Sequence, residues 1–274
     1  MSPTFSLADA LSIHRLGYGA MRITGDGVWG PPKDKAEAIR VLQTTRELGI
    51  DFIDTADSYG PYISEELIAE ALYPYPEELV IATKAGLERT GPNQWPINGR
   101  PEHLEEACKG SLKRLKLDQI PLYQWHRFDP DVPSDESLDK LKELQQQGYV
   151  KHLGLSEVSI DQIKEAQQYF DVVSVQNKFS LTERKWAEEL DWCAERGIAF
   201  IPWYPLDAGK VTDADLQAVA DKHGKSVYQI ALAWLLHYRK NILLIPGTSS
   251  VNHLRENTAA RAIELDEADM ARLA

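Results

Sequence analysis

Eight short β-rich runs recur along the chain, and each is followed by a segment with helical periodicity. The runs are His14–Gly19, Asp51–Asp54, Leu79–Lys84, Leu122–His126, His152–Ser156, Val172–Gln176, Ala199–Pro202 and Leu243–Pro246. Runs such as 172–175 and 242–245 are continuously apolar, which is typical of strands buried on both faces. Strands that alternate with helices pair in parallel through right-handed crossovers. Eight such units predict an α/β fold, a (β/α)8 TIM barrel, which fits a length of 274 residues.

Helical patterns fill the intervals between these runs. They are Lys35–Leu48, Pro101–Leu115, Ser134–Gln147, a helix that begins at Ser159, Thr182–Arg196, Ser226–Tyr238 and His253–Arg261. In the first, Ala38, Val41 and Leu42 have amphipathic spacing, and Gly49 follows as a C-terminal signal. No linker rich in Gly, Ser or Pro divides the chain, so we expect one domain over residues 1–274.

Charge and composition exclude several classes of protein. The formal net charge of −12 argues against binding to nucleic acids or acidic membranes, which favour basic surfaces. Residues 1–20 lack the pattern of a signal peptide, and no apolar run reaches the roughly 18 residues of a membrane span. Cys108 and Cys193 are far apart and have no metal-ligand spacing. We therefore expect a soluble cytoplasmic protein, a monomer, without a metal.

Ionisable side chains stand at three successive strand ends, where a barrel of this kind places its active site. They are Asp54, Lys84 and His126, and Tyr59 follows five residues after Asp54. A tyrosine hydroxyl with a pKa near 10 is a weak acid, and a neighbouring lysine favours its phenolate. The aspartate would hold the lysine, and the histidine would bind a carbonyl oxygen. This set predicts reduction of a carbonyl group, with Tyr59 as the proton donor.

The same residues resemble the catalytic tetrad of the aldo-keto reductases. FIDTADSYG at 52–60, VIATK at 80–84 and the histidine that closes the fourth strand match the family's pattern in order. RLGYGAM at 15–21, GLSE at 154–157, VQN at 175–177 and LIPGTSSVNHLREN at 244–257 resemble its cofactor-binding segments. The chain is most similar to bacterial members described as pyridoxal reductases or general oxidoreductases. The resemblance implies reduction of an aldehyde or ketone by NADPH, with Tyr59, Lys84, Asp54 and His126 as the catalytic residues.

The resemblance also implies a cofactor site. Its residues are Gly19, Ala20, Met21, Asp54, Ser156, Glu157, Gln176, Trp203, Tyr204, Pro205, Leu206, Gly247, Thr248, Ser249, Ser250, His253, Glu256 and Asn257. Ser156 and Gln176 would hold the nicotinamide carboxamide, and Trp203 would stack on the ring.

Three positions depart from the family's pattern. Glu157 replaces an asparagine, so it can accept hydrogen bonds but cannot donate them. Gly247 replaces a phosphate-binding lysine, and His253 an arginine. Hydroxyls and a helix N-terminus still favour an anion, and no acid lies within residues 247–250, so we expect NADPH over NADH. A lysine at position 247 should strengthen that preference, and His253 or Arg255 could supply part of the missing charge.

Substrate contacts are expected from the irregular stretches Thr24–Asp34 and Leu87–Gly99 and from the strand ends. The predicted substrate-binding residues are Met21, Trp29, Tyr59, Trp95, Trp125, His126 and Arg127, with Asn177 as a further wall residue. The link Leu206–Thr212 is short, which suggests an open site. Pyridoxal, aromatic aldehydes and larger ketones all remain candidate substrates.

Two alternatives stay open at this point. In an aldolase or epimerase on the same barrel, Lys84 would form a Schiff base, which would leave Tyr59 and His126 unexplained. In a regulatory subunit, NADPH would be held as a redox signal with little turnover. Oxidation of NADPH in the presence of aldehydes distinguishes all three hypotheses.

Overall fold

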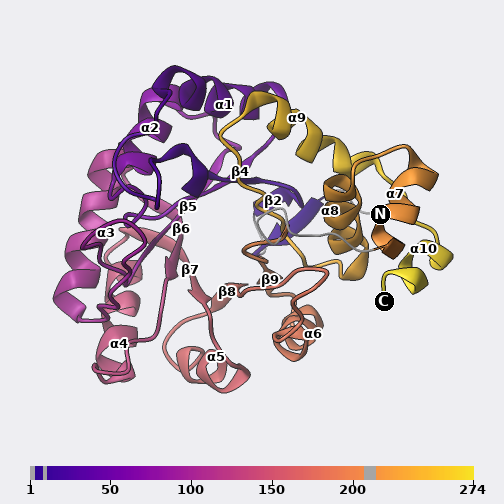
Figure 1. The fold of residues 1–274 in the computed structure, drawn as a ribbon. Helices are drawn as coiled ribbons and strands as arrows, with labels where there is room; N and C mark the ends of the chain where they lie inside the picture. Colours follow the sequence, from indigo (N-terminus) through magenta and orange to yellow (C-terminus); the bar gives the residue numbers. More distant parts are fainter. Residues whose placement is uncertain (1–3, 9–10, 207–213) are drawn as a thin grey trace.

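Seven parallel strands form a curled sheet at the centre of the computed structural model, in chain order from β3 to β9 (Figure 1). The structure describes residues 4–8, 11–206 and 214–274. The strands of this sheet are β3 (Tyr18–Gly19), β4 (Phe52–Asp54), β5 (Val80–Ala85), β6 (Ile120–Trp125), β7 (Val150–Ser156), β8 (Val172–Gln176) and β9 (Ala199–Phe200). The parallel sheet confirms the strand order that the sequence predicts.

Residues 241–247 close the ring between the last strand and the first. Ile242 pairs with Phe200 of β9, and Leu244 pairs with Leu16 just before β3, both in parallel. The Leu244 N–H donates to the Arg15 carbonyl at 2.8 Å. The predicted (β/α)8 barrel is therefore correct, but its eighth strand consists of single bridges rather than a continuous ladder.

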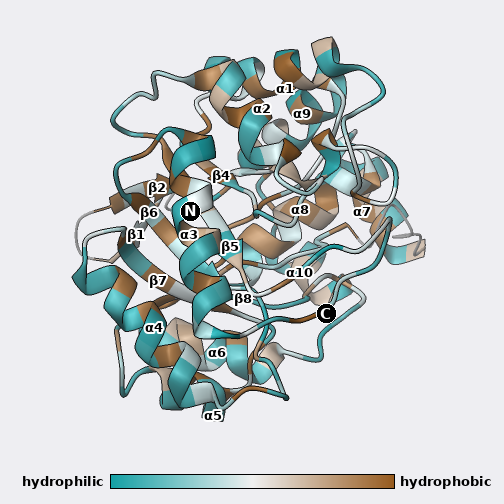
Figure 2. Ribbon diagram, turned by 90° about the vertical axis from the view of Figure 1, so that its left-hand side faces the viewer, coloured by the Kyte–Doolittle hydropathy of each residue, from teal (hydrophilic) through white to brown (hydrophobic). Residues whose placement is uncertain are grey.

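Helices surround the sheet in chain order, as Figure 1 shows. They are α1 (Lys35–Glu47), α2 (Ile63–Leu72), α3 (Pro101–Leu115), α4 (Ser134–Gln146), α5 (Ile160–Ala166), α6 (Ala187–Glu195), α7 (Ala214–His223), α8 (Val227–Tyr238), α9 (Val251–Ala259) and α10 (Glu267–Arg272), with short 3₁₀ turns η1 (Ala20–Ile23) and η3 (Ala260–Ala262). Figure 2 shows mainly hydrophilic residues on the outward side of α3 and α4. Their apolar faces pack on the strands, which stabilises the barrel through burial of apolar surface.

Local signals in the sequence explain where several helices begin. The Asp34 carboxylate accepts from the Glu37 N–H at 2.8 Å and caps α1. Ser159 and Ser226 form capping boxes with the glutamine three residues later, at the start of α5 and α8. Helix α1 is followed by Gly49 at φ +64°, a left-handed conformation that glycine adopts at low cost.

Two predicted boundaries were wrong. The run His14–Gly19 is divided, because β1 (Thr4–Leu7) and β2 (Leu11–His14) form an antiparallel hairpin that the sequence analysis did not foresee. Leu7 and Ile13 of this hairpin are fully buried against inward residues of the barrel, so it closes the lower end. The helix predicted from Thr182 begins only at Ala187. The Ser180 hydroxyl accepts from the N–H groups of residues 182 and 183, which holds a turn there.

Helices α2, α7 and α10 were not anticipated either. Most of the predicted link Leu206–Thr212 lies outside the described residues. Within the described part of the chain, no helix is long and apolar enough to cross a membrane.

Candidate functional site

The alternation of side chains along parallel strands places a polar layer at the upper end of the barrel. Phe52, Val80 and Leu122 point into the barrel and belong to its apolar inner cluster. Nearer the carboxyl ends of the same strands, the inward positions hold Asp54, Lys84 and Gln124. The carboxyl ends of four strands, β4, β5, β6 and β8, thereby bring an acid, a lysine and two amides together.

Asp54 and Lys84 form an ion pair that is shielded from solvent. Lys84 Nζ lies 2.6 Å from Asp54 Oδ1, and the two side chains are 0% and 3% exposed. The ammonium also donates to the Thr55 carbonyl at 2.7 Å. The second oxygen, Asp54 Oδ2, accepts from Gln124 Nε2 at 3.1 Å and from Gln176 Nε2 at 2.9 Å. Every polar atom of the pair therefore has a partner, as a buried pair requires.

Tyr59 lies above this pair, in the loop between β4 and α2. Lys84 Nζ is 5.3 Å from the centroid of its ring. Burial raises the pKa of the Tyr59 hydroxyl, and the Lys84 charge only partly opposes that effect. Burial alone would lower the pKa of Lys84, but the charges of Asp54 and Tyr59 outweigh it, and the net direction is upward. Lys84 therefore stays charged, and Tyr59 keeps its proton at neutral pH.

His126 follows β6 and faces Tyr59, with 6.1 Å between the ring centroids and 78° between the ring planes. Burial, together with the charges of Lys84 and Arg127, holds the pKa of His126 well below its ordinary value. Its Nδ1 has no hydrogen-bond partner among the described residues. Because His126 also lines the cavity, its neutral imidazole can offer its one N–H to a carbonyl oxygen there.

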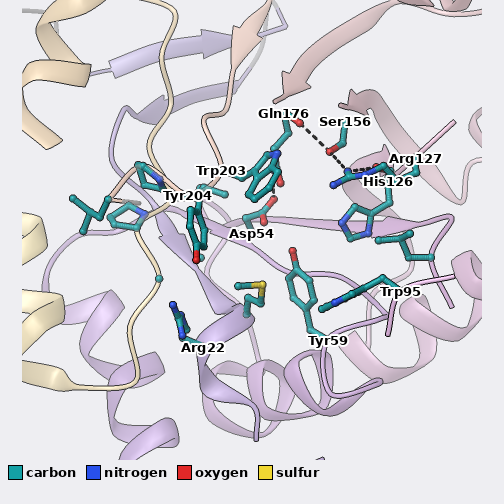
Figure 3. A pocket seen from close by; sticks show the side chains of 18 of the residues that line it. Arg22, Asp54, Tyr59, Trp95, His126, Arg127, Ser156, Gln176, Trp203 and Tyr204 are labelled. Atoms are coloured by element: carbon teal, nitrogen blue, oxygen red, sulfur yellow. Dashed lines mark hydrogen bonds between the residues drawn. The ribbon is translucent and has the colours of Figure 1, made fainter. Parts of the chain in front are cut away.

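A cavity of about 480 Å³ opens above these groups (Figure 3). Its walls are Gly19, Met21, Arg22, Asp54, Tyr59, Leu87, Trp95, Ile97, His126, Arg127, Ser156, Gln176, Trp203, Tyr204, Pro205, Leu206, Ile245, Pro246 and Gly247. Tyr59, Trp95 and His126 gather at one end, and Arg22 and Tyr204 lie at the other. The volume and the mixture of aromatic walls with a few polar groups are typical of a site for a small organic molecule.

Glycines at the Arg22 end allow two backbone segments to approach closely. A Cβ added at Gly19 would lie 2.5 Å from the Ile245 carbonyl oxygen. A Cβ at Gly247 would lie 2.9 Å from the Gly19 oxygen and 3.4 Å from Arg22 Cγ. The lysine proposed at position 247 would therefore have to displace its neighbours. Arg22, which the sequence analysis missed, already places a cation beside Gly247.

Only some of the residues predicted to bind the nicotinamide end of the cofactor line the cavity. Ser156, Gln176 and Trp203 line the cavity, whereas Glu157 turns away from it. Glu157 Oε1 accepts from the Trp203 indole N–H and from the Lys178 N–H, both at 2.6 Å. Ala20 is fully buried in η1 and, unlike Gly19 and Met21, does not line the cavity.

The predicted phosphate-binding segment lies at the rim, around the N-terminus of α9. Thr248 and Asn257 are buried, Ser249 and His253 are exposed, and Ser250 and Glu256 are half-buried. The sequence segment 247–250 holds no acid, but the fold brings one to this N-terminus, since Glu37 of α1 accepts from the Val251 N–H at 3.1 Å. Arg255 pairs with Glu47 at 2.9 Å. The sequence could not reveal these contacts, because they join helices more than 200 residues apart.

Two of the predicted substrate contacts lie outside the cavity lining. Trp125 alternates with Gln124, so it points toward the helices, where it is 1% exposed and packs on Phe128. Trp29 stacks on the Arg89 guanidinium, which in turn lies 3.7 Å from the Trp95 ring centroid. Trp29 therefore supports the cavity wall through Arg89 and does not form it.

Asn177 is also outside the lining. It is fully buried and bonds to both backbone groups of Val158. Of the two irregular stretches, only Leu87–Gly99 contributes wall residues, namely Leu87, Trp95 and Ile97. The first and last of these were not predicted. Both are apolar residues in a polar loop, and that contrast was the available signal.

Comparisons with known proteins match this arrangement along nearly the whole chain. Residues 15–274 match the model of the aldo/keto reductase family. An uncharacterized oxidoreductase of Schizosaccharomyces pombe is 50% identical over 263 residues, which cover 95% of this chain and 86% of the relative. Pyridoxine 4-dehydrogenase of Escherichia coli is 42% identical over 273 residues, 97% and 95% of the two chains. A crystal structure of a thermostable aldo-keto reductase with the inhibitor epalrestat superposes with a TM-score of 0.88, at 31% identity and 98% coverage of both chains.

Proposed function

Because the chain belongs to the aldo/keto reductase family, and is therefore an oxidoreductase that couples a nicotinamide cofactor to carbonyl reduction, we propose that it reduces an aldehyde with NADPH through Tyr59. One observation carries the proposal: the solvent-shielded Lys84–Asp54 pair lies beneath Tyr59, and Tyr59 and His126 share one end of an aromatic cavity.

The residues around the polar layer fit a nicotinamide. Gly19 and Gly247 leave backbone surface where a Cβ would intrude, and Trp203 offers an aromatic face. Gln176 directs its N–H group to Asp54, so its Oε1 can accept from a carboxamide NH2. Bound NADPH supplies the hydride that forms the new C–H bond at the carbonyl carbon.

Tyr59 then gives its proton to the carbonyl oxygen, which becomes far more basic than a phenolate as the hydride arrives. The raised pKa of Tyr59 keeps the hydroxyl protonated at neutral pH. It does not prevent the proton transfer, because the alkoxide that forms is a stronger base than the Tyr59 phenolate. Lys84, held charged by Asp54, stabilises the resulting phenolate. The neutral His126 donates one N–H to the carbonyl oxygen and orients it.

The preference for NADPH rests on opposing charges at the rim. Arg22, the Thr248 and Ser249 hydroxyls and the α9 N-terminus favour a phosphate. Glu37, bonded to the Val251 N–H, disfavours it. We expect a preference for NADPH over NADH of roughly 10–100-fold. Glu37→Gln should increase this preference, because the variant keeps an acceptor for the Val251 N–H but removes the negative charge.

An aromatic aldehyde is the substrate class that the cavity supports best. Tyr59 and Trp95 pack edge to face, with 6.3 Å between centroids, and Trp203 lies across the cavity. Pyridoxal is the first candidate, since a relative with 42% identity is a pyridoxine 4-dehydrogenase. That the protein is a single-domain, cytoplasmic monomer stays a prediction from the sequence.

The test is the initial rate of NADPH oxidation with pyridoxal, benzaldehyde, a short aliphatic aldehyde and a ketone, each repeated with NADH. We expect turnover with the aromatic aldehydes and the NADPH preference given above. Binding of NADPH without oxidation by any substrate would favour the regulatory alternative. Equal rates with NADPH and NADH would refute the proposed recognition of the 2′-phosphate.

A further inference from the structure

The carboxamide of a nicotinamide makes hydrogen-bonding demands that can be counted against this site. Its oxygen needs a donor, and its NH2 group needs up to two acceptors. Acceptors are available, because Gln176 Oε1 and the Ser156 hydroxyl stand at the cavity. The donors that the family resemblance suggests are a serine, an asparagine and a glutamine, and in this chain each of the three positions is changed or already engaged.

Position 157 cannot donate. Glu157 replaces the asparagine, and its Oε1 is occupied by the Trp203 indole N–H and the Lys178 N–H at 2.6 Å each. The carboxylate therefore fixes the edge of Trp203, an aromatic wall of the cavity. Glu157 adopts φ +56°, a left-handed conformation, and its side chain is bonded to Trp203 and is not part of the cavity lining.

The other two donors are engaged within the polar layer. The Ser156 hydroxyl donates to the Gln176 backbone carbonyl at 2.9 Å. Gln176 Nε2 donates to Asp54 Oδ2 at 2.9 Å and lies 3.5 Å from Gln124 Oε1. To donate to a carboxamide, either side chain would have to give up a bond inside this buried layer, which would leave an acceptor there without its partner.

Arg127 is a hydrogen-bond donor that lines the cavity beside Ser156. Its Nη1 donates to Ser156 Oγ at 3.0 Å and to the His126 carbonyl at 2.6 Å, as the dashed contact in Figure 3 shows for Ser156. The guanidinium carbon lies 6.0 Å from the Trp203 ring centroid. A guanidinium has five N–H groups in a rigid plane, so these two contacts leave donors for a ligand.

We infer that Arg127 donates the hydrogen bond to the carboxamide oxygen, while Glu157 acts as a positioning residue for Trp203. In this chain Arg127 would supply the hydrogen-bond donor that the family's asparagine provides, and Glu157, at the position of that asparagine, would fix Trp203. This inference rests on the proposed use of a nicotinamide cofactor. It assigns a donor for the carboxamide oxygen, which loses one where Glu157 replaces the family's asparagine.

The first experiment measures dissociation constants in the absence of substrate, for NADPH and for 2′-phospho-ADP-ribose, which lacks the nicotinamide. Arg127→Met should weaken NADPH binding by roughly 10–100-fold, the usual value of a charge-assisted hydrogen bond. It should change the affinity for the fragment by less than about twofold. Arg22→Met is the matched control, because it removes a cation at the other end of the same cavity and should weaken both ligands alike.

The second experiment isolates the contact between Glu157 and Trp203. The positioning role is tested by a cycle with Trp203→Phe: Glu157→Ala should weaken NADPH binding when Trp203 is present and have little effect when it is absent.

The outcomes separate this inference from the proposed function. Equal losses of NADPH and fragment in Arg127→Met, or no loss of either, would overturn the role of Arg127. An undiminished effect of Glu157→Ala without Trp203 would overturn the role of Glu157. Failure of the wild-type protein to bind NADPH would overturn the proposed function, and the inference with it.

Discussion

Replacement of Lys84 by methionine tests how the buried layer couples stability to catalysis. Methionine nearly preserves the length of the side chain but removes the ammonium that lies 2.6 Å from Asp54 Oδ1 and 2.7 Å from the Thr55 carbonyl. Both acidic and basic members of the pair are almost completely buried, so water cannot replace the lost contacts without a rearrangement of the layer.

The loss of one partner from a buried ion pair costs about 3–5 kcal/mol, because the other charge is left without compensation. Asp54 would keep two amide donors, from Gln124 and Gln176, at 3.1 and 2.9 Å. We therefore expect a decrease of about 3 kcal/mol in the free energy of unfolding, at the lower end of that range. For a chain of this size the decrease corresponds to a melting temperature lower by roughly 6–12 °C.

Calorimetry or denaturant unfolding measures this loss, and the double variant Lys84→Met/Asp54→Asn is the control. The second substitution removes the uncompensated charge, so the double variant should be more stable than Lys84→Met although neither reduces aldehydes. If the two variants unfold together, or if Lys84→Met is as stable as the wild type, the argument from a buried charge is wrong.

Three further outcomes follow from the same geometry. His126→Ala should lower kcat/KM by roughly 10²–10³-fold. The pH profile of the wild type should show no inflection near 6.5, because the pKa of His126 lies well below that value. An inflection near 6.5 that disappears in His126→Ala would contradict the lowered pKa. Because the pKa of Tyr59 is raised, kcat for reduction should stay level from about pH 6 to about pH 9 and fall only as the hydroxyl ionises at higher pH; a fall that begins near neutrality in the wild type and is absent from Tyr59→Phe would show that the pKa is lowered. Arg22→Met should raise the KM for NADPH and reduce its dependence on salt, measured between low and physiological ionic strength; an unchanged KM would exclude Arg22 from the phosphate site.

The barrel could be predicted from the sequence because its strands and helices leave local signals. Apolar runs and capping residues located β4 to β9 and most helices within a few positions. The N-terminal hairpin left no such signal, since its pairing depends on Leu7 and Ile13 packing against residues distant in the chain. The eighth strand was overestimated, because an apolar run alone does not show how many ladder bonds its neighbours allow.

For the site, the position of a residue at a strand end predicted which side chains come together, but the sequence analysis did not consider in which direction each side chain points. Asp54, Lys84 and His126 were found because they end successive strands. Because residues 124 and 125 alternate in direction, the strand pattern would have placed Gln124 in the polar layer and removed Trp125 from the predicted substrate contacts. The contact of Glu37 with α9 could not be predicted, because it depends on how two helices pack around the closed barrel.

The central claim is that Tyr59 gives the proton while the hydride is transferred, and single-turnover kinetics test it most directly. Protein loaded with NADPH is mixed with pyridoxal or benzaldehyde, and the loss of the reduced nicotinamide is followed in time for the wild type and for Tyr59→Phe. We predict a rate constant lower by roughly 10²–10⁴-fold in the variant, with an unchanged dissociation constant for NADPH. A variant that retains more than about a tenth of the wild-type rate constant would contradict the assignment of Tyr59 as the proton donor.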